Sequence, residues 1–409
     1  MVLEYKPINI VHFVGGVKNS GAFKGANLLH KDLLKNKVNS EILYDDRKNI
    51  IKSLSSKIRQ NIEKLPKIFY PNRENTSFSS SIVGYNFNNE SKYKNADIVH
   101  LHWINNGFFD ISKIQEINKP IVWTIRDMWP FTGGCHYSLG CNKFQKECGE
   151  CPQLKSKKKF DLSTFNQNRK LKYFNKKISF VVNSNWMKKM AEKSKILKDH
   201  EIFTFFPSFD LKSFYEDISD DILTNLKINK NKKIILYGAQ NIEAQYKGFN
   251  FFLDSLDYLD KEKYLIIFFG NFWKENKIRE KKFEYLNLGF INDIKIQRKL
   301  YSIADVFVAT SLQEGFPKTV AESLLCHTPV VYFKDTAIED ICEDRIVGGY
   351  GANYCDSADI ARGIDWIIEN KDKSKDLAIL ASNKIKKEFN SEKLIKKYLD
   401  LYNFVNKKI

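Results

Sequence analysis

The chain has 409 residues, too many for one ordinary hydrophobic core and about right for two domains of roughly 200 residues each. Hydrophobic residues make up 43% of it, which excludes an intrinsically disordered protein. The 66 basic and 49 acidic residues give a net charge of +17. That charge is compatible with binding to nucleic acid, to an anionic membrane surface or to phosphate-bearing substrates. The net charge alone does not distinguish among these partners.

No stretch of the sequence approaches the roughly 20 consecutive apolar residues of a transmembrane helix. The first residues, MVLEYKPINIVHFV, indicate a strand after a short polar lead rather than a signal peptide. We therefore expect a cytoplasmic protein.

Short apolar runs alternate with helical segments through the N-terminal half. The first run, at 8–14, ends in Gly15-Gly16 and leads into an amphipathic helix. Further buried-strand candidates lie at 97–101, 119–125 and 178–183. This alternation predicts a parallel sheet covered by helices on both faces.

The same pattern starts again in the C-terminal half. Its apolar runs lie at 233–238, 264–269, 285–289, 305–309 and 329–333. Between the halves, 206–214 is non-periodic and contains a proline, so we expect domains over 1–206 and 207–390. The remaining residues, 391–409, are predicted to form a helix that packs back on the N-terminal domain. Ligands bind beyond the carboxyl ends of the strands in a parallel sheet. If the two sheets face each other, we therefore expect a ligand site in the cleft between them.

The most informative segment runs from Glu314 to Glu322, with the sequence EGFPKTVAE between a strand and a helix. A glycine-containing loop that opens a helix presents unpaired backbone N–H groups and the positive helix end, which together hold phosphate. A carboxylate at each end of the segment can accept hydrogen bonds from sugar or ribose hydroxyls. The segment therefore predicts a site for a diphosphate flanked by sugars.

This segment resembles the Glu-x7-Glu donor signature of the family 4 glycosyltransferases, and YSIADVFVATSLQEGFPKTVAESLLCHTPVV follows that family's pattern almost throughout. The resemblance implies the GT-B fold, two Rossmann-like domains facing across a cleft, and transfer of a hexose with retention of configuration. It implies that Glu314 and Lys247 are catalytic and that no cofactor is required for catalysis. The donor-binding residues that it implies are Gly15, Gly16, Gly248, Phe290, Ile291, Phe316, Pro317, Lys318, Thr319 and Glu322.

The segments DIVHLHW and IVWTIRDMWPFTGGCHYSLGC resemble a branch of the same family that assembles bacterial capsule, O-antigen or exopolysaccharide. Relatives carry histidine before the Asp-Met-Trp, where this chain has Arg126, so that histidine's role is not transferred. Arg126, Asp127 and His136 are the residues expected to contact sugar. The implied partners are a UDP- or GDP-sugar and a saccharide acceptor, lipid-linked by family expectation, with no nucleic acid.

Four cysteines lie close together in the sequence, with the spacing C-x5-C-x6-C-x2-C. They are Cys135, Cys141, Cys148 and Cys151. Four thiolates at this spacing suit a structural zinc ion within a knuckle at 135–151, while paired or free thiols and a redox role are the alternatives.

A predicted helix within 47–73 carries apolar residues at helical spacing, with lysine and arginine among them. Such a helix can lie on an anionic bilayer, which would make the protein peripheral on the cytoplasmic face of an inner membrane. It can equally pack its apolar stripe on the N-terminal domain.

Two rival functions follow from the same sequence. Another GT-B enzyme, such as a sugar-nucleotide epimerase, would share the donor motif. A non-catalytic basic protein that binds nucleic acid or membrane through its +17 charge would not need Glu314 or Glu322.

Overall fold

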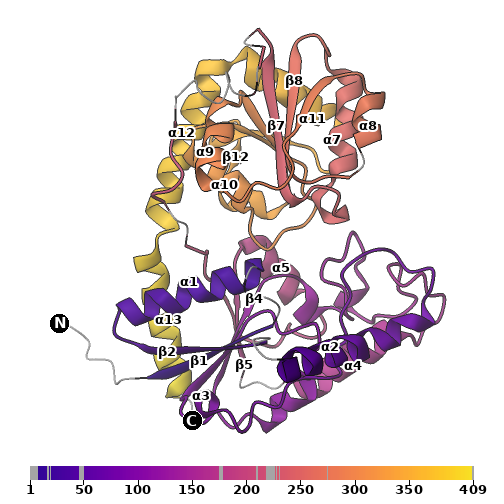
Figure 1. Cartoon of the computed structure of the whole chain (residues 1–409), viewed down its shortest axis with the longest axis vertical. Helices are drawn as coiled ribbons and strands as arrows, with labels where there is room; N and C mark the ends of the chain where they lie inside the picture. The colour runs from indigo at the N-terminus through magenta and orange to yellow at the C-terminus, as the bar shows by residue number, and fades with distance from the viewer. Residues whose placement is uncertain are drawn as a thin grey trace. The chain divides into compact units, whose positions relative to one another are not determined.

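The structure is a computed structural model, and it describes residues 8–15, 18, 20–45, 50–174, 178–208, 211–217, 226, 228–229, 231–273 and 275–407 (Figure 1). Contacts divide the chain into two compact units. The first contains Met1–Pro207 together with Ser391–Ile409, and the second contains Ser208–Asn390.

The first unit is built on a six-stranded sheet with the order β2-β1-β3-β4-β5-β6, in which every neighbouring pair is parallel. The strands are β1 (Asn9–Val14), β2 (Asn39–Tyr44), β3 (Ile98–Leu101), β4 (Ile121–Ile125), β5 (Ile178–Val182) and β6 (Ile202–Thr204). The longer helices are α1 (Gly21–Lys35), α2 (Ile50–Lys64), α4 (Leu162–Tyr173), α5 (Asn185–Glu192) and α13 (Ser391–Asn406). The four runs predicted in this half are strands, as expected.

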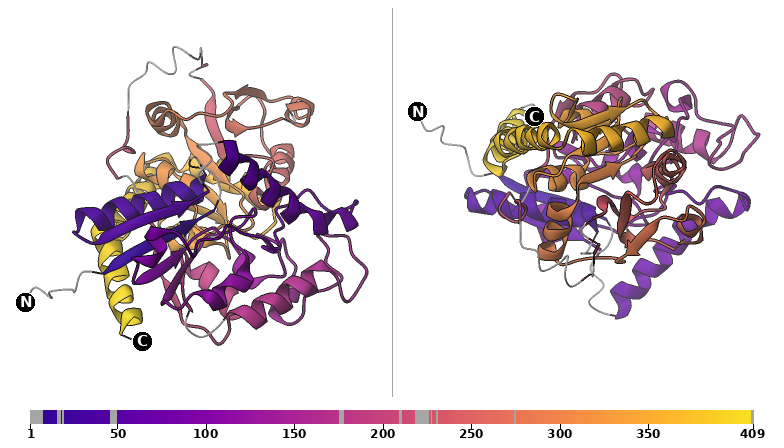
Figure 2. Two further views of the ribbon diagram at one scale, coloured as in Figure 1. Left: turned by 60° about the horizontal axis from the view of Figure 1, so that its bottom comes forward. Right: turned by 90° about the horizontal axis from the view of Figure 1, so that it is seen from above.

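The two faces of this sheet bury different cores because successive side chains of a strand point to opposite faces. One face carries Val11, Val99 and Trp123 in a large cluster. The opposite face carries Ile10 and Ile98, which pack with residues of α13. Figures 1 and 2 show α13, in yellow, beside the sheet and α1. The prediction that the C-terminal helix packs back on the first domain is therefore confirmed.

Two tyrosines of α13 form buried hydrogen bonds with the sheet. The hydroxyl of Tyr402 lies 2.7 Å from Nδ1 of His100, and that of Tyr398 lies 2.9 Å from Oγ1 of Thr124. The other ring nitrogen of His100 is 2.8 Å from the same Thr124 hydroxyl. These bonds link α13 to β3 and β4.

Replacing Tyr402 with phenylalanine is expected to lower the free energy of unfolding by about 1–3 kcal/mol, because it leaves a buried nitrogen of His100 without its partner. Urea unfolding followed by circular dichroism measures this. Tyr258, which is 64% exposed, provides the matched control: Tyr258→Phe should leave the free energy of unfolding unchanged. Equal effects of the two substitutions would contradict the proposed contribution of the buried bond.

The second unit contains a seven-stranded sheet with the order β12-β13-β11-β10-β7-β8-β9, again parallel throughout. The strands are β7 (Lys233–Asn241), β8 (Tyr264–Asn271), β9 (Glu284–Asn287), β10 (Val306–Ala309), β11 (Val330–Phe333), β12 (Glu343–Asp344) and β13 (Gly348–Ala352). Its longer helices are α7 (Phe249–Ser255), α8 (Glu275–Glu280), α9 (Ile294–Ile303), α10 (Lys318–Leu325), α11 (Ser357–Glu369) and α12 (Lys371–Glu388). The expectation of a second parallel sheet is confirmed.

None of the helices in the described ranges has the length and apolar character needed to cross a bilayer.

Candidate active site

Lys247 and Glu314 meet at the carboxyl ends of two neighbouring strands of the second unit. Lys247 closes a short 3-10 turn after β7, and Glu314 follows β10 by five residues. Because β7 and β10 pair directly, the two loops are adjacent, and Nζ of Lys247 lies 2.6 Å from Oε1 of Glu314. The hydroxyl of Ser311 donates to the same oxygen at 2.5 Å.

This ion pair is largely shielded from water, with 16% of the Lys247 side chain and 11% of the Glu314 side chain exposed. Burial by itself lowers the pKa of Lys247, but the Glu314 carboxylate beside it outweighs burial and raises that pKa above its ordinary value. Lys247 is therefore a fixed cation at the edge of the sheet.

Gly248 gives the Lys247 loop its shape. Its backbone is left-handed, with φ +64°, and a Cβ atom there would stand 2.0 Å from the carbonyl oxygen of Thr310. The carbonyl of Lys247 accepts hydrogen bonds from the hydroxyls of Tyr237 at 3.0 Å and Thr310 at 3.1 Å. The loop after β7 is thus pinned to the loop after β10.

The rest of the predicted loop leads directly into α10. Pro317 precedes the first helical residue, Lys318, whose side chain is exposed. The first-turn N–H groups of a helix have no partner within the helix and carry its partial positive charge. Here that turn contains Thr319 and follows Phe316, whose ring packs 5.5 Å from that of Phe389. Anion binding by this segment stays a prediction.

Glu322 lies one turn further along α10. Its Oε2 accepts a hydrogen bond from the hydroxyl of Tyr301 at 3.1 Å. Burial raises the pKa of Glu322 to about 7, although Tyr301 and Lys318 both act to lower it. This carboxyl group therefore changes charge near neutral pH.

If Glu322 binds the ribose of a nucleotide, as the resemblance implies, its titration should make nucleotide binding depend on pH. If ribose hydroxyls donate to its ionised form, binding lowers the pKa, so affinity should rise by up to about tenfold from pH 6 to pH 8 and then level off. Calorimetric titration with UDP across this range measures the effect. In the Glu322→Gln variant the nucleotide phosphates still titrate, but the part of the pH dependence of UDP affinity that comes from Glu322 should be absent. Parallel pH profiles for the two proteins would contradict this role.

A third loop of the second unit follows β9. Gly289 adopts φ +63° and its carbonyl accepts from the N–H of Gly270 at 2.7 Å. Phe290 comes next and is 55% exposed, and the carbonyl of Ile291 accepts from Gln297 at 2.7 Å. Phe290 and Ile291 thus lie at the same edge of the sheet as Lys247 and Glu314.

In the first unit, the glycine predicted after the first strand is in close contact with the backbone. The N–H of Gly15 donates to the carbonyl of Trp103 at 2.6 Å, and a Cβ atom on Gly15 would stand 2.7 Å from that oxygen. Gly16, also predicted to bind the donor, lies outside the described residues.

Asp127 and His136 form a hydrogen-bonded chain at the carboxyl end of β4. Nδ1 of His136 lies 2.7 Å from Oδ2 of Asp127, and Nε2 lies 2.9 Å from Oγ of Ser79. Two further donors fix Asp127: Nε1 of Trp103 at 3.1 Å and the N–H of Trp129 at 2.9 Å. The structure therefore brings two of the three expected sugar contacts together.

Arg126 lies in different surroundings from its neighbour Asp127. Its guanidinium donates to Oδ1 of Asn183 at 3.3 Å and lies 3.5 Å from Nδ1 of His102. Its Nε is buried and has no hydrogen-bond partner among the residues that the structure describes. The guanidinium also occupies the space beside Gly25, where a Cβ atom would be 3.0 Å away. Burial lowers the pKa of Arg126.

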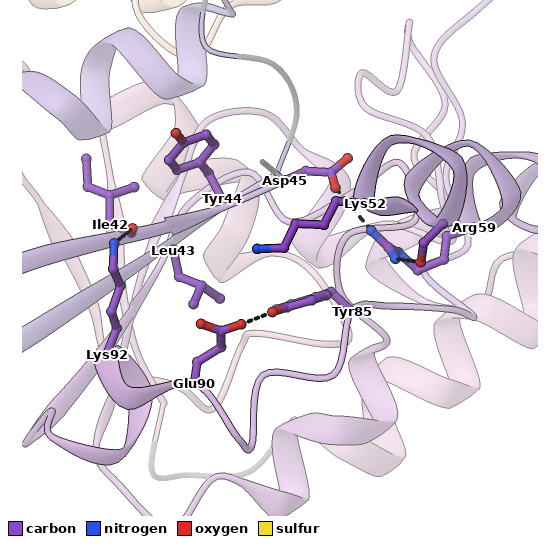
Figure 3. Close-up of a pocket in the computed structure, with 10 residues that line it drawn as sticks. Ile42, Leu43, Tyr44, Asp45, Lys52, Arg59, Tyr85, Glu90 and Lys92 are labelled. Atoms are coloured by element: carbon purple, nitrogen blue, oxygen red, sulfur yellow. Dashed lines mark hydrogen bonds and ion pairs between the residues drawn. The ribbon is translucent and has the colours of Figure 1, made fainter. Parts of the chain in front are cut away.

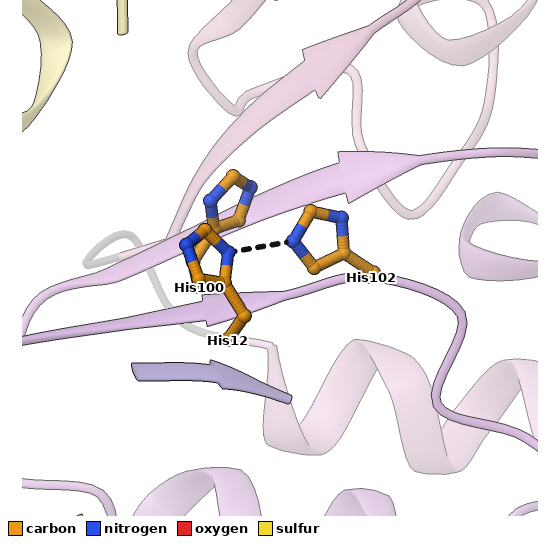
Figure 4. Close-up of side chains that lie close together, drawn as sticks. All are labelled: His12, His100 and His102. Carbon is orange, nitrogen blue, oxygen red and sulfur yellow. Dashed lines mark hydrogen bonds between the residues drawn. The ribbon is translucent and has the colours of Figure 1, made fainter. Parts of the chain in front are cut away.

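Three buried histidines, which the sequence did not predict as a group, lie close together (Figure 4). Arg126 lies next to one of them, His102. Nδ1 of His12 is 2.9 Å from Nε2 of His102, and the ring of His100 is 4.2 Å from that of His102. Burial, reinforced by nearby positive charge, lowers the pKa of His12 to about 3. Among the described residues, these histidines form the only group in which three or more possible metal-ligand atoms lie within 4.8 Å of one another. The positive charge of the Arg126 guanidinium would repel a metal cation bound by these histidines. The contacts among the three rings are instead those of a network of neutral, hydrogen-bonded imidazoles.

The first unit also contains a cavity of about 410 Å³ at the carboxyl end of β2 (Figure 3). It is lined by Ile42, Leu43, Tyr44, Asp45, Lys52, Ser55, Arg59, Tyr85, Glu90 and Lys92. Figure 3 shows Lys52 and Arg59 entering from α2, and the hydroxyl of Tyr85 hydrogen-bonded to Glu90. Aromatic rings combined with charges of both signs suit a ligand rich in hydroxyl groups. Sequence analysis did not predict this cavity.

Comparison with known families gives one match, over residues 218–384, to the sequence model described as glycosyl transferases group 1. This range contains Lys247, Glu314 and Glu322. A shorter similarity, 31% identity over 61 residues, connects the chain with a protein of Escherichia coli (strain K12) named as a colanic acid biosynthesis glycosyl transferase, WcaC. It spans 14% of this chain and 15% of that protein.

The fold is similar to those of several solved structures. Sucrose-phosphate synthase from Thermosynechococcus elongatus gives a TM-score of 0.68 at 15% identity, covering 98% of this chain and 100% of that one. Anabaena Alr3699/HepE, solved with UDP-glucose, gives a TM-score of 0.61 at 14% identity, covering 97% and 99%. At these identities the similarity establishes the fold, which is the α/β GT-B fold expected from the sequence.

Proposed function

We propose that this protein is a retaining hexosyltransferase that uses a UDP- or GDP-sugar, because residues 218–384 match the family model described as glycosyl transferases group 1. Its acceptor in this proposal is a lipid-linked saccharide of surface-polysaccharide biosynthesis. One observation carries the proposal: the buried Lys247–Glu314 pair, 2.6 Å long, lies on adjacent strand ends where α10 begins.

In the proposed reaction, the nucleoside diphosphate is the leaving group. The bond between the anomeric carbon and the diphosphate oxygen breaks, and negative charge grows on the diphosphate. Lys247 and the first-turn N–H groups of α10 stabilise that charge without a metal ion. Glu314 accepts hydrogen bonds from the sugar hydroxyls, and Glu322 accepts them from the ribose. Phe290 and Ile291 border the nucleobase.

In this proposal the configuration at the anomeric carbon is retained because the acceptor attacks from the front face. The acceptor oxygen forms its bond to the anomeric carbon on the face that the diphosphate leaves, and its proton passes to a diphosphate oxygen. In this scheme Glu314 forms no covalent bond to sugar. A glycosyl-enzyme trapped on Glu314 and shown to turn over would overturn this step.

A donor screen tests the proposed function. UDP- and GDP-sugars are added singly while melting temperature and nucleotide release are measured, since a ligand specific for the native state raises apparent stability. We expect one donor to stabilise the protein and to release nucleotide when a saccharide acceptor is present. Isomerisation of a labelled donor without transfer would favour the sugar-nucleotide epimerase instead.

Asp127 and His136 are proposed to bind a sugar hydroxyl. Their mutual hydrogen bond of 2.7 Å orients both groups, and the indole of Trp103 holds the carboxylate. We do not extend the same role to Arg126, because its guanidinium is engaged with Asn183 and His102.

The proposal places the protein on an anionic membrane surface through the face of α2. This helix buries polar side chains, Ser56 at 1% and Glu63 at 3% exposure, and leaves an apolar stripe in water. The stripe continues into the 3-10 helix Leu65–Phe69 that follows α2. It consists of Leu54, Ile58, Ile62, Leu65, Ile68 and Phe69, which are 37–84% exposed. A contiguous exposed apolar patch of this kind is typical of an interaction surface.

Three contacts determine which face of α2 points outward. The carboxylate of Glu63 accepts from the backbone N–H groups of Ser80 and Ser81 at 2.7 Å and of Ile82 at 3.2 Å. The inward position of Glu63 leaves the opposite stripe exposed. Lys57 and Lys64 are also exposed on this helix, and cations beside apolar groups suit anionic phospholipid.

The same helix lines the cavity at the end of β2, to which it contributes Lys52, Ser55 and Arg59. A lipid-linked acceptor can therefore place its polar saccharide in that cavity while its chain lies along the α2 stripe. This arrangement supports a lipid-linked acceptor over a free one.

A further inference from the structure

Four of the seven cysteines meet at one place in the first unit. Cys135, Cys141, Cys148 and Cys151 line a single cavity of about 20 Å³. That volume has room for one water molecule or one ion. We propose that this cavity is a structural zinc site, because four sulfur donors are the set that a tetrahedral zinc ion favours.

The two residues between Cys148 and Cys151 both have a positive φ. Gly149 adopts φ +145°, with Lys159 O only 2.1 Å from the position of a Cβ atom, and Glu150 adopts φ +42°. The turn between Cys148 and Cys151 is therefore held in one unusual shape.

Main-chain N–H groups point at two of these sulfurs. Gly133 donates to the sulfur of Cys148, and both Gln153 and Leu154 donate to that of Cys151. Burial outweighs these donors and raises the pKa of both thiols, that of Cys148 to about 12. A metal ion must therefore displace the thiol protons when it binds.

Two lysine side chains lie beside the loop that carries the four cysteines. Four thiolates around one Zn²⁺ carry a net charge of −2, and four thiol protons pass to solvent when the ion binds. Lys170 is fully buried near Cys135 and Cys148 and donates to the carbonyl of Thr132 at 2.9 Å. Lys143 donates to the carbonyl of Gly149 at 3.0 Å.

The sulfurs must approach one another when the ion binds. A zinc–sulfur distance of about 2.3 Å in a tetrahedron places the sulfurs about 3.8 Å apart. In the described part of the chain, the cysteines do not form a group within 4.8 Å, although all are free thiols. Ion binding should therefore tighten the loop 135–151, which also carries His136.

Metal analysis of the purified full-length protein tests the proposal. After exhaustive exchange into chelator-free buffer, mass spectrometry of the elements should find about one zinc per chain. The Cys148→Ser and Cys151→Ser variants should lose most of it. Cys355 is exposed and lies outside the cluster, so Cys355→Ser provides the matched control and should keep its zinc.

Cobalt titration keeps the test decisive if a serine variant fails to fold. Wild-type protein stripped of metal should bind about one Co²⁺ and develop the visible absorption of a tetrahedral thiolate complex, which zinc then displaces. Absence of this absorption, together with no zinc uptake, would overturn the proposal. Intact-mass measurement showing disulfides among these four cysteines in the active protein would overturn it as well.

Discussion

Replacing Lys247 with methionine should lower kcat/KM for sugar transfer by on the order of 10²- to 10³-fold. The ammonium lies 2.6 Å from Glu314, and it is the cation that neutralises the departing diphosphate in the proposed mechanism. Methionine preserves the length and apolar stem of lysine but removes its charge. Steady-state nucleotide release at saturating acceptor measures the loss, which should fall mainly on kcat because the charge grows in the transition state.

A second lysine provides a matched control for this substitution. Nζ of Lys281 also lies 2.6 Å from a carboxylate, that of Asp257, whose side chain is 61% exposed. The Lys281→Met variant removes an ion pair of equal length in the same unit and should leave kcat/KM unchanged. If Lys247→Met also retained full activity, the leaving-group role of Lys247 would be wrong.

Serine at Leu54, Ile58, Leu65 and Phe69 together should weaken binding to anionic vesicles by at least roughly 100-fold. These four side chains are 50–84% exposed, so their loss removes apolar contact with the bilayer without opening a cavity in the protein. Sedimentation with vesicles containing phosphatidylglycerol measures the partition coefficient. Added salt should weaken wild-type binding further, since lysines of α2 supply the attraction to the headgroups.

Other exposed apolar residues supply the control for vesicle binding. Trp273 is 78% exposed and Leu380 is 52% exposed, and both lie in the second unit. Serine at these two positions should leave the partition coefficient within about twofold of wild type. Equal losses in the two variants, or none in either, would show that α2 does not bind the membrane.

Most of the fold could be predicted because its strands are continuous apolar runs. The nine predicted strands are all present, but β2, β6, β12 and β13 were not predicted. The sequence of β13 is GGYGA, and glycine has little preference for strands. It is a strand because its backbone pairs with β11 and β12. Tertiary pairing of this kind leaves no periodic signal in the sequence.

The candidate site could be predicted where one local segment carries it. Glu314 and Glu322 lie on one loop and the helix it opens, so their spacing is visible in the sequence. The histidine network is different, because His12 and His102 are 90 residues apart and meet only through the pairing of β1 with β3. Arg126 and Asp127 are adjacent in sequence yet contact different groups. The direction of a side chain after a strand depends on local backbone geometry that residue type does not specify.

The crystal structure of the protein with a nucleotide-sugar bound tests the central claim most directly. We predict that the diphosphate lies within hydrogen-bonding distance of Lys247 and the first-turn N–H groups of α10. Glu322 should then accept hydrogen bonds from the ribose hydroxyls. A nucleotide-sugar bound elsewhere, with the segment from Glu314 to Glu322 free of it, would contradict this account.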